Sequence, residues 1–453
     1  MNQSHSSSRR SFMRLAGSVA SIAALGRLSN MNALAQSASD YKALVCVFLF
    51  GGNDSHNMVV PQETAANAAY RAARKGLTLP DGNTKLLPIV TRAGVKYAFN
   101  DGLTKIAPLW SDGKLAVVAN VGMLSQPTTR QEYLAKTVPL PTNLFSHADQ
   151  VIAKQAGDPN GSSGTGWTGR IADAVNAMNG AAHFPAAFSM SGNALIIAGT
   201  TIQTATLYPG FDLSADGMNA YPPSASAARA QGLQDVLTFD SGLTLVQAAN
   251  GVRQNAVDLN KMLRSAGTAA PLTTKFPGTN LGLQMKQVAD IIRLRATTGM
   301  SRQVFFCSLG GFDTHSNQSW THWDLLGQLG ESLRAFYDAT LEMGVADKVT
   351  SFTETDFGRT LESSGTGSDH GWGGHQLVLG GAVRGGDLYG TFPNLTLGGP
   401  DDANSRGVLI PTTSLDQYGA TFAKWFGVGD GALPQVFPNI AKFPSADLGF
   451  LAS

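Results

Sequence analysis

The sequence predicts an α/β protein whose mostly parallel sheet is sandwiched between helices. Two observations lead to this class. Five short apolar runs lack polar alternation, which is typical of strands buried on both faces. Helical patterns lie between several of these runs, and such alternation favours a parallel sheet covered by helices. The runs span residues 43–50, 115–121, 304–309, 349–352 and 376–379.

The helical segments follow in chain order. Residues 103–110 precede the second expected strand, 281–295 precede the third, and 324–343 separate the third from the fourth. Residues 415–426 form a further amphipathic pattern near the C-terminus, where we expect a docking helix.

Residues 155–280 have a different character. They are rich in Gly and Thr and contain a long polar helical pattern at 245–264. We expect them to form a cap-like insertion within one domain that spans residues 36–453.

The N-terminus carries the features of an export signal. Arg9 and Arg10 precede a moderately apolar run at 15–25, and Ala33-Leu34-Ala35 offers a small-x-small cleavage site before Gln36. The run is far short of the roughly 20 residues that span a bilayer. These features predict a twin-arginine signal peptide over residues 1–35, and hence the twin-arginine translocase as a partner during export. The expected location is periplasmic or secreted, and the alternative is an amphipathic N-terminal helix.

Charge and cysteine content narrow the classes of protein. The chain has 33 Lys and Arg against 32 Asp and Glu, and removal of the four leader arginines leaves a mature net charge of −3. A balanced chain without a basic stripe indicates no nucleic-acid partner. No second apolar segment is long enough for a stable transmembrane anchor. Cys46 and Cys307 lie inside apolar runs, so we expect buried free thiols.

Polar residues gather at the ends of the expected strands. Ligands of parallel α/β sheets bind at the carboxyl ends of the strands. A single Asp there is more often a turn or cap residue, but aspartates and histidines together favour a divalent metal such as Zn²⁺, Mn²⁺ or Ca²⁺. The candidate ligands are Asp54, Asp313, His315, Asp356, His370 and His375.

Two further residues are candidates for a role in chemistry. Ser146 precedes a helical stretch, where its oxygen would lie near the positive end of the helix dipole. It is a candidate nucleophile, although this segment alone favours an ordinary N-cap. Arg359 follows the fourth strand and could bind a phosphate or sulfate bidentately, or form a salt bridge.

Together these segments resemble a known family. The motifs are GGNDSHNMVVP, LFSHADQ, GGFDTHSNQ, TDFGRT, DHGWGGHQLVLGGAVRGG and LDQYGATFAKWFGV, in this order. They resemble the signatures of the exported family called domain of unknown function 1501, which looks like a branch of the alkaline-phosphatase and sulfatase superfamily. The resemblance runs from about Leu44 to about Val428.

The resemblance implies an alkaline-phosphatase-like fold and a role for each matching residue. Asp54 matches the metal ligand after the first strand, and Ser146 matches the nucleophile. Asp313 and His315 match the pair at the first metal, Asp356 begins the second-metal pair, and His370 or His375 matches the late histidine. Two departures occur: Phe357 follows Asp356 where the superfamily usually has His, and Asp313-x-His315 is spaced more tightly than the usual pair.

The function implied is hydrolysis of phosphate or sulfate esters of small molecules or glycans, with a divalent metal and a Ser nucleophile. The alternative is a catalytically degenerate member that acts as a periplasmic or cell-surface binding protein. The residue after Asp356 favours the alternative, whereas Asp54, Ser146, Asp313 and His315 favour the enzyme.

Overall fold

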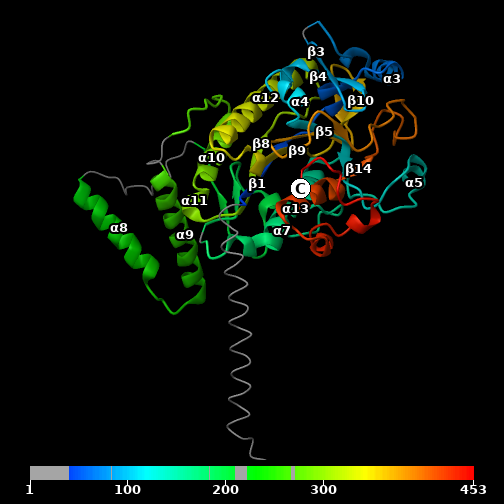
Figure 1. Ribbon diagram of the computed structural model, residues 1–453. Coiled ribbons are helices and arrows are strands. Elements are labelled where there is room, and N and C mark those ends of the chain that lie inside the picture. Colours follow the sequence, from blue (N-terminus) through cyan, green and yellow to red (C-terminus); the bar gives the residue numbers. More distant parts are fainter. Residues whose placement is uncertain (1–39, 83, 183, 210–221, 267–270, 453) are drawn as a thin grey trace, which may run out of the picture.

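The structure is a computed structural model that describes residues 40–82, 84–182, 184–209, 222–266 and 271–452. Figure 1 shows an α/β body with a pair of helices beside it. The predicted signal peptide at 1–35 lies outside the described residues. Within them, no helix is long and apolar enough to cross a membrane.

The centre of the body is a mixed, mostly parallel sheet that contains all five predicted strands. In the described chain it has nine strands, in the order β13-β5-β12-β9-β1-β8-β6-β7, with β14 also paired to β5. The long strands are β1 (Lys42–Leu49), β5 (Leu115–Gly122), β8 (Arg302–Leu309), β9 (Val349–Thr355) and β12 (Gly374–Gly380). The short ones are β6 (Ala187–Ser189), β7 (Thr204–Thr206), β13 (Leu388–Tyr389) and β14 (Thr413–Ser414).

One strand departs from the expected parallel direction. β12 runs antiparallel to both β5 and β9, whereas β1 is parallel to β8 and β9. After β9 the chain forms a hairpin of β10 (Arg359–Ser364) and β11 (Gly367–His370) and enters β12 directly. A parallel strand needs a crossover that carries the chain back along the sheet, usually through a helix, whereas this hairpin leaves the chain at the edge where β9 ends, so β12 runs antiparallel. The start of β12 therefore lies at the edge of the sheet where β9 ends.

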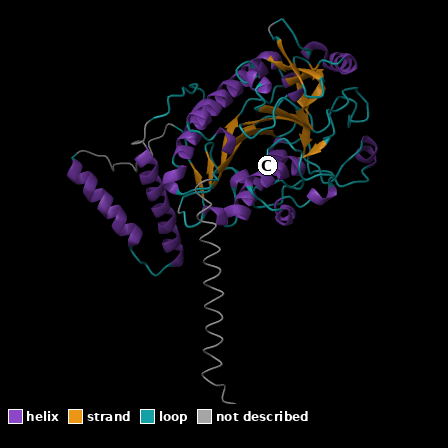
Figure 2. Ribbon diagram, in the orientation of Figure 1, coloured by secondary structure: helices purple, strands orange, loops and turns teal. Residues whose placement is uncertain are grey.

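Helices cover both faces of the sheet (Figure 2). Alternate residues of β1 divide between two cores, because successive strand side chains point to opposite faces. Val45 and Val47 pack in a core with α10 (Asn280–Arg293) and α12 (Gln318–Glu342). Cys46 and Phe48 pack in the opposite core with α7 (Trp167–Val175) and α13 (Leu415–Phe426). Cys46 and Cys307 are both free and buried, as predicted.

Most of the predicted helices are present, but residues 103–110 do not form one helix. They divide between a 3₁₀ turn at Asp101–Leu103 and α4 (Pro108–Ser111). Pro108 stands at the first position of α4, where its missing N–H costs nothing, and the chain thus starts a new helix there.

Residues 155–280 contribute to two different parts of the molecule. The first part supplies α7 and the edge strands β6 and β7 of the main sheet. The second part forms a hairpin of α8 (Pro223–Thr238) and α9 (Thr244–Ala266), which stands beside the body in Figure 1. Only this second part has the outward position expected of an inserted segment.

The remaining elements surround the sheet. β2 (Val59–Pro61), β3 (Leu86–Val90) and β4 (Lys96–Asn100) form a small antiparallel sheet. The other helices are α2 (Ser55–Met58), α3 (Thr64–Arg74), α5 (Arg130–Ala135), α6 (His147–Ala156), α11 (Arg295–Thr298) and α14 (Leu433–Val436). Further 3₁₀ turns lie at Lys75–Leu77, Asn176–Asn179, Leu195–Ile197, Ala346–Lys348, Asp430–Ala432 and Ile440–Lys442.

Candidate metal centre

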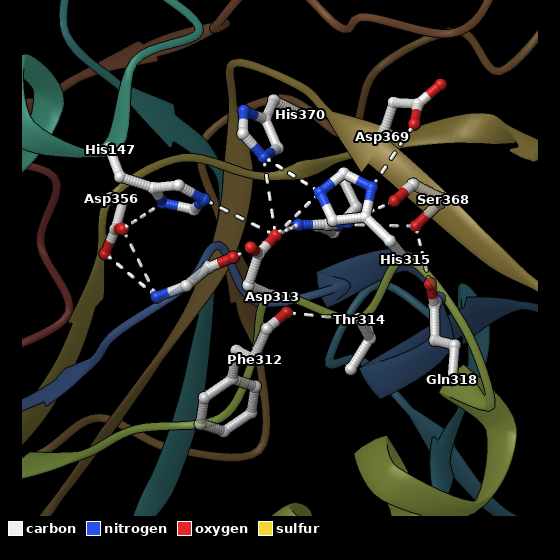
Figure 3. A network of polar contacts seen from close by, with 12 residues as sticks. His147, Phe312, Asp313, Thr314, His315, Gln318, Asp356, Ser368, Asp369 and His370 are labelled. Atoms are coloured by element: carbon white, nitrogen blue, oxygen red, sulfur yellow. Dashed lines mark hydrogen bonds and ion pairs between the residues drawn. The ribbon is translucent and has the colours of Figure 1, made fainter.

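Histidines from three segments meet at one carboxylate beyond the ends of the central strands (Figure 3). The carboxylate belongs to Asp313, which follows β8. His315 comes from the same loop, His370 from the end of β11, and His147 from the first turn of α6. Because β12 is antiparallel, the segment that precedes it reaches the edge where β8 and β9 end.

The distances place Asp313 Oδ1 at the centre of this cluster. His315 Nε2 lies 2.9 Å from it, His370 Nε2 3.3 Å and His147 Nε2 3.4 Å. The Nε2 atoms of His315 and His370 are 3.1 Å apart. One ligand-type atom each from His147, Asp313 and His370 lie within 4.8 Å of one another, a spacing that could hold a metal ion.

The other ring nitrogen of each histidine, Nδ1, lies close to an oxygen atom on the side of the ring away from Asp313. His370 Nδ1 donates to the carbonyl oxygen of Phe145 at 2.7 Å, and His147 Nδ1 lies 2.7 Å from Asp356 Oδ2. His315 Nδ1 is 3.4 Å from Asp369 Oδ1. Carbonyl and carboxylate oxygens only accept, so a neutral imidazole held in this way carries its proton on Nδ1 and turns the lone pair of Nε2 toward Asp313. Metal-binding histidines usually have such an outer partner.

The charge states at neutral pH suit this arrangement. Partial burial lowers the pKa of His370 and keeps its ring neutral, although the bond to Phe145 opposes the shift. Burial opposes ionisation of Asp313, but the hydrogen bond and charge of Arg359 outweigh it, so the pKa of Asp313 falls. The hydrogen bond with Asp356 raises the pKa of His147 against the effect of burial. In the absence of a cation, a proton on His147 offsets part of the negative charge.

Asp356 is fixed by the backbone of the loop after β1. The amide of Gly51 lies 3.2 Å from each of its two carboxylate oxygens. Gly51 has φ +113°, and a Cβ there would lie 2.3 Å from the backbone nitrogen of Asp313. Only glycine allows this approach, which brings the loops after β1, β8 and β9 together.

Arg359 and a small pocket complete the surroundings of the cluster. The Arg359 side chain is buried, and its Nη1 donates to Asp313 Oδ1 at 2.7 Å and to Gly51 O at 3.2 Å. Its Nη2 donates to the carbonyl of Ser368. A pocket of about 380 Å³ opens over the cluster and is lined by Phe50, Gly51, His147, Ala148, Val151, Asp313 and Asp356.

Asp54 has different partners from the other candidate ligands. It is fully buried, forms an ion pair with Arg74 of α3, and accepts a hydrogen bond from Gln318. Gln318 in turn accepts from Ser368 at 2.6 Å, so these contacts link Asp54 to the cluster through Gln318 and Ser368. Asp54 Oδ1 has no hydrogen-bond partner, but Asp54 is not among the described residues whose ligand atoms gather at Asp313.

His375 also lies apart from Asp313. It belongs to β12, its ring centroid is 4.7 Å from that of His56, and its Nδ1 accepts from the amide of Asn120 at 3.0 Å. Burial lowers the pKa of His375 to about 3, so the ring is neutral. Of the two late histidines, the structure places His370 at the cluster.

Ser146 is the N-cap of α6, and its hydroxyl accepts from the amide of Asp149 at 3.4 Å. It stands between Phe145, which holds His370, and His147. The sequence reasoning did not list His147 among the ligands, although it lies next to Ser146 and is one of six histidines that fall in or beside the motif segments.

The fold and the site define an α/β protein with a His/Asp cluster where the strand ends of a mostly parallel sheet converge. The chain belongs to the family described as "Protein of unknown function (DUF1501)", whose model matches residues 41–406. This match confirms the family resemblance seen in the motifs.

Comparison with other proteins adds little. No curated protein matches the chain. Two solved structures are similar to it, "Crystal structure of Ps i-CgsB" and the same protein "in complex with k-i-k-neocarrahexaose". Each is 10% identical and covers 88% of this chain and 77% of its own, with TM-scores of 0.35 and 0.33. Likeness at this level supports no conclusion about function.

Proposed function

We propose that the protein is a metal-dependent hydrolase of phosphate or sulfate esters, and that His147, Asp313, His315 and His370 hold its divalent cation. The observation that carries the proposal is the convergence of three Nε2 atoms on Asp313 Oδ1 while each Nδ1 faces an outer oxygen.

The residues present fit a metal ion. His147 Nε2 is buried and makes no hydrogen bond, but it faces Asp313 Oδ1 at 3.4 Å, and a cation between these two atoms would bind both. Three imidazoles and one carboxylate suit Zn²⁺ or Mn²⁺ better than Ca²⁺, which prefers oxygen ligands. Such a cation, when bound, polarises a substrate oxygen and lowers the pKa of a nearby hydroxyl.

The side chains of the chain supply the remaining functions. Asp356 and Phe145 O orient two of the imidazoles. Arg359 places a fixed positive charge at Asp313, where it would also attract the anionic group of an ester. The pocket over the cluster gives the ester access. Ser146 is the proposed nucleophile, because it lies between two residues that are tied to the cluster.

We also propose a relation to alkaline phosphatases and sulfatases, which the ordered motifs of the sequence support. We further propose export through the twin-arginine route with a leader at 1–35, which Arg9-Arg10 and Ala33-Leu34-Ala35 support. The substrate is expected to be a small-molecule or glycan ester in the periplasm or outside the cell.

The second candidate is a periplasmic or cell-surface binding protein without turnover. One observation favours it: Asp54 is paired with Arg74, and His375 packs against His56, so neither stands ready to complete a second metal site. A centre of two metal ions would need ligands besides those of the cluster, whereas a single cation could serve binding alone.

Metal analysis and an ester screen on the same preparation test both candidates. We expect protein purified from the periplasm to contain about one equivalent of Zn or Mn and to hydrolyse aryl phosphates or aryl sulfates. His147→Ala and His370→Ala should lose the metal. Asp338→Asn, a change at a half-buried ion-pair residue of α12, should retain it. Stoichiometric metal without turnover would favour the binding protein. Failure to retain either metal after incubation with it would contradict the metal centre.

A further inference from the structure

Two tryptophans form an aromatic surface near the start of α12. Trp320 is 56% exposed, and its ring centroid lies 5.1 Å from that of Trp323 at an interplanar angle of 30°. Neither belongs to the metal cluster or to the pocket above it. Trp320 exposes more than half of its side chain beside the half-buried Trp323, and exposed apolar surface of this kind can mark a binding site.

Trp323, the inner residue of the pair, is held in a fixed position. Trp323 Nε1 donates to Asp101 Oδ1 at 2.9 Å. Asp101 opens the 3₁₀ turn that packs on α12, and the next residue, Gly102, approaches so closely that a Cβ there would lie 2.6 Å from the Trp323 carbonyl oxygen. Because the ring of Trp323 is already ordered, binding of a ligand against it costs little side-chain conformational entropy.

Polar side chains surround the aromatic surface. A small pocket of about 150 Å³ lies between Thr84, Ser319 and the two tryptophans. A second pocket of about 560 Å³ shares Trp323 and contains many hydrogen-bonding groups. Its polar side chains are Asp101, Thr104, Lys105, Thr279, Asn280, Asp324, Gln328 and Glu331. Three carboxylates against one amine give this pocket a negative balance.

We propose that this surface binds a glycan made of neutral or cationic sugar units. A pyranose ring has one apolar C–H face and a rim of hydroxyl groups, which match an indole face bordered by amide, hydroxyl and carboxylate groups. The excess of carboxylates is complementary to amino sugars, tolerates neutral sugars, and repels sulfated or uronic acid chains. The site is separate from the metal centre, and its test does not depend on ester hydrolysis.

Calorimetric titration of the full chain with three defined hexamers tests the proposal: cellohexaose (neutral), chitosan hexamer (cationic) and oligogalacturonate hexamer (anionic). We expect the neutral or the cationic hexamer to bind and the anionic one to fail. Trp320→Ala should weaken binding about tenfold, equivalent to about 1.4 kcal/mol at 25 °C. Trp320→Phe should recover part of the loss, because it retains a ring face.

Leu341→Ala is the matched control, since Leu341 is a similarly exposed apolar residue at the other end of α12. The affinity of Leu341→Ala for the hexamer that binds should equal that of the parent protein. Unchanged thermal unfolding of Trp320→Ala would show that the exposed position is not needed for the fold.

Several results would overturn the proposal. One is equal affinity of Trp320→Ala and the parent for the hexamer that binds. Others are absence of binding to all three hexamers and preference for the anionic hexamer. Binding of tetramethylammonium or a lysine peptide at this surface in place of the sugars would assign it to cations held by the rings. A dimer that dissociates on Trp320→Ala in sedimentation would assign it to a second copy.

Discussion

Replacing Asp356 with Asn should weaken metal binding although Asp356 is not itself a proposed ligand. The parent carboxylate accepts from Gly51 N and from His147 Nδ1 at 2.7 Å. An Asn of the same shape can still accept from Gly51 through Oδ1, but its amide nitrogen would then donate toward His147. That donation moves the ring proton from Nδ1 to Nε2, so the nitrogen that faces Asp313 loses its free lone pair.

Loss of an outer partner of this kind typically costs 10- to 100-fold in metal affinity, or about 1.4–2.7 kcal/mol. The assay is competition between the metal-free protein and a chelator of known affinity, with Zn²⁺ and Mn²⁺ in turn. His147→Ala, which removes a proposed ligand, should cost more than Asp356→Asn, and Asp338→Asn should cost nothing. Affinity of Asp356→Asn within twofold of the parent would refute the orienting role.

Three further changes test other parts of the proposal. Ser146→Ala should abolish ester turnover and, because the hydroxyl caps α6, lower the free energy of unfolding by about 1 kcal/mol; stability loss with parental turnover would leave Ser146 as a cap only. Replacing Arg9 and Arg10 with Lys should keep the precursor in the cytoplasm. Normal periplasmic accumulation of this variant, measured by cell fractionation, would exclude the twin-arginine route. Burial raises the pKa of Asp416 from 3.8 to about 7, so the folded state binds more protons than the unfolded state and the free energy of unfolding should fall as pH rises through this interval, by up to about 1.4 kcal/mol per pH unit. Denaturant titrations between pH 4 and pH 8 should show this slope in the parent and a weaker one in Asp416→Asn; identical slopes would exclude Asp416 as the source.

The sequence allowed the five long strands to be predicted, because strands covered on both faces carry an unbroken apolar signal. It also placed Asp313, His315 and Asp356 after expected strands and His370 just before the fifth, and the structure brings these four together. The direction of β12 was not predictable from its own residues. It depends on the absence of a crossover helix between β9 and β12, a feature of the connection and not of the strand.

Two contacts at the site could not be predicted from the residues that flank them in the sequence. Arg74 lies 20 residues beyond Asp54, in a helix whose position over the strand end is set by packing, so the pairing that neutralises Asp54 could not be read from either segment. His147 comes from α6, whose docking against β9 brings residues 209 positions apart into contact. The sequence indicated the start of this helix only through Ser146, as a candidate nucleophile.

The position of β1 sets the order in which the protein can fold during synthesis. β1 is the first strand of the described chain, yet it lies in the middle of the sheet between β8 and β9, and its last contact with β9 joins residues 306 positions apart. At about 5–20 residues per second, the ribosome needs roughly 15–60 s to make the chain between these partners. Until β8 has been made, which takes most of that time, this strand of eight mostly apolar residues has no partner on either side. An export signal placed just before such a strand would be displayed long before the fold is complete, so a check that waits for folding could act only after β9 has been made.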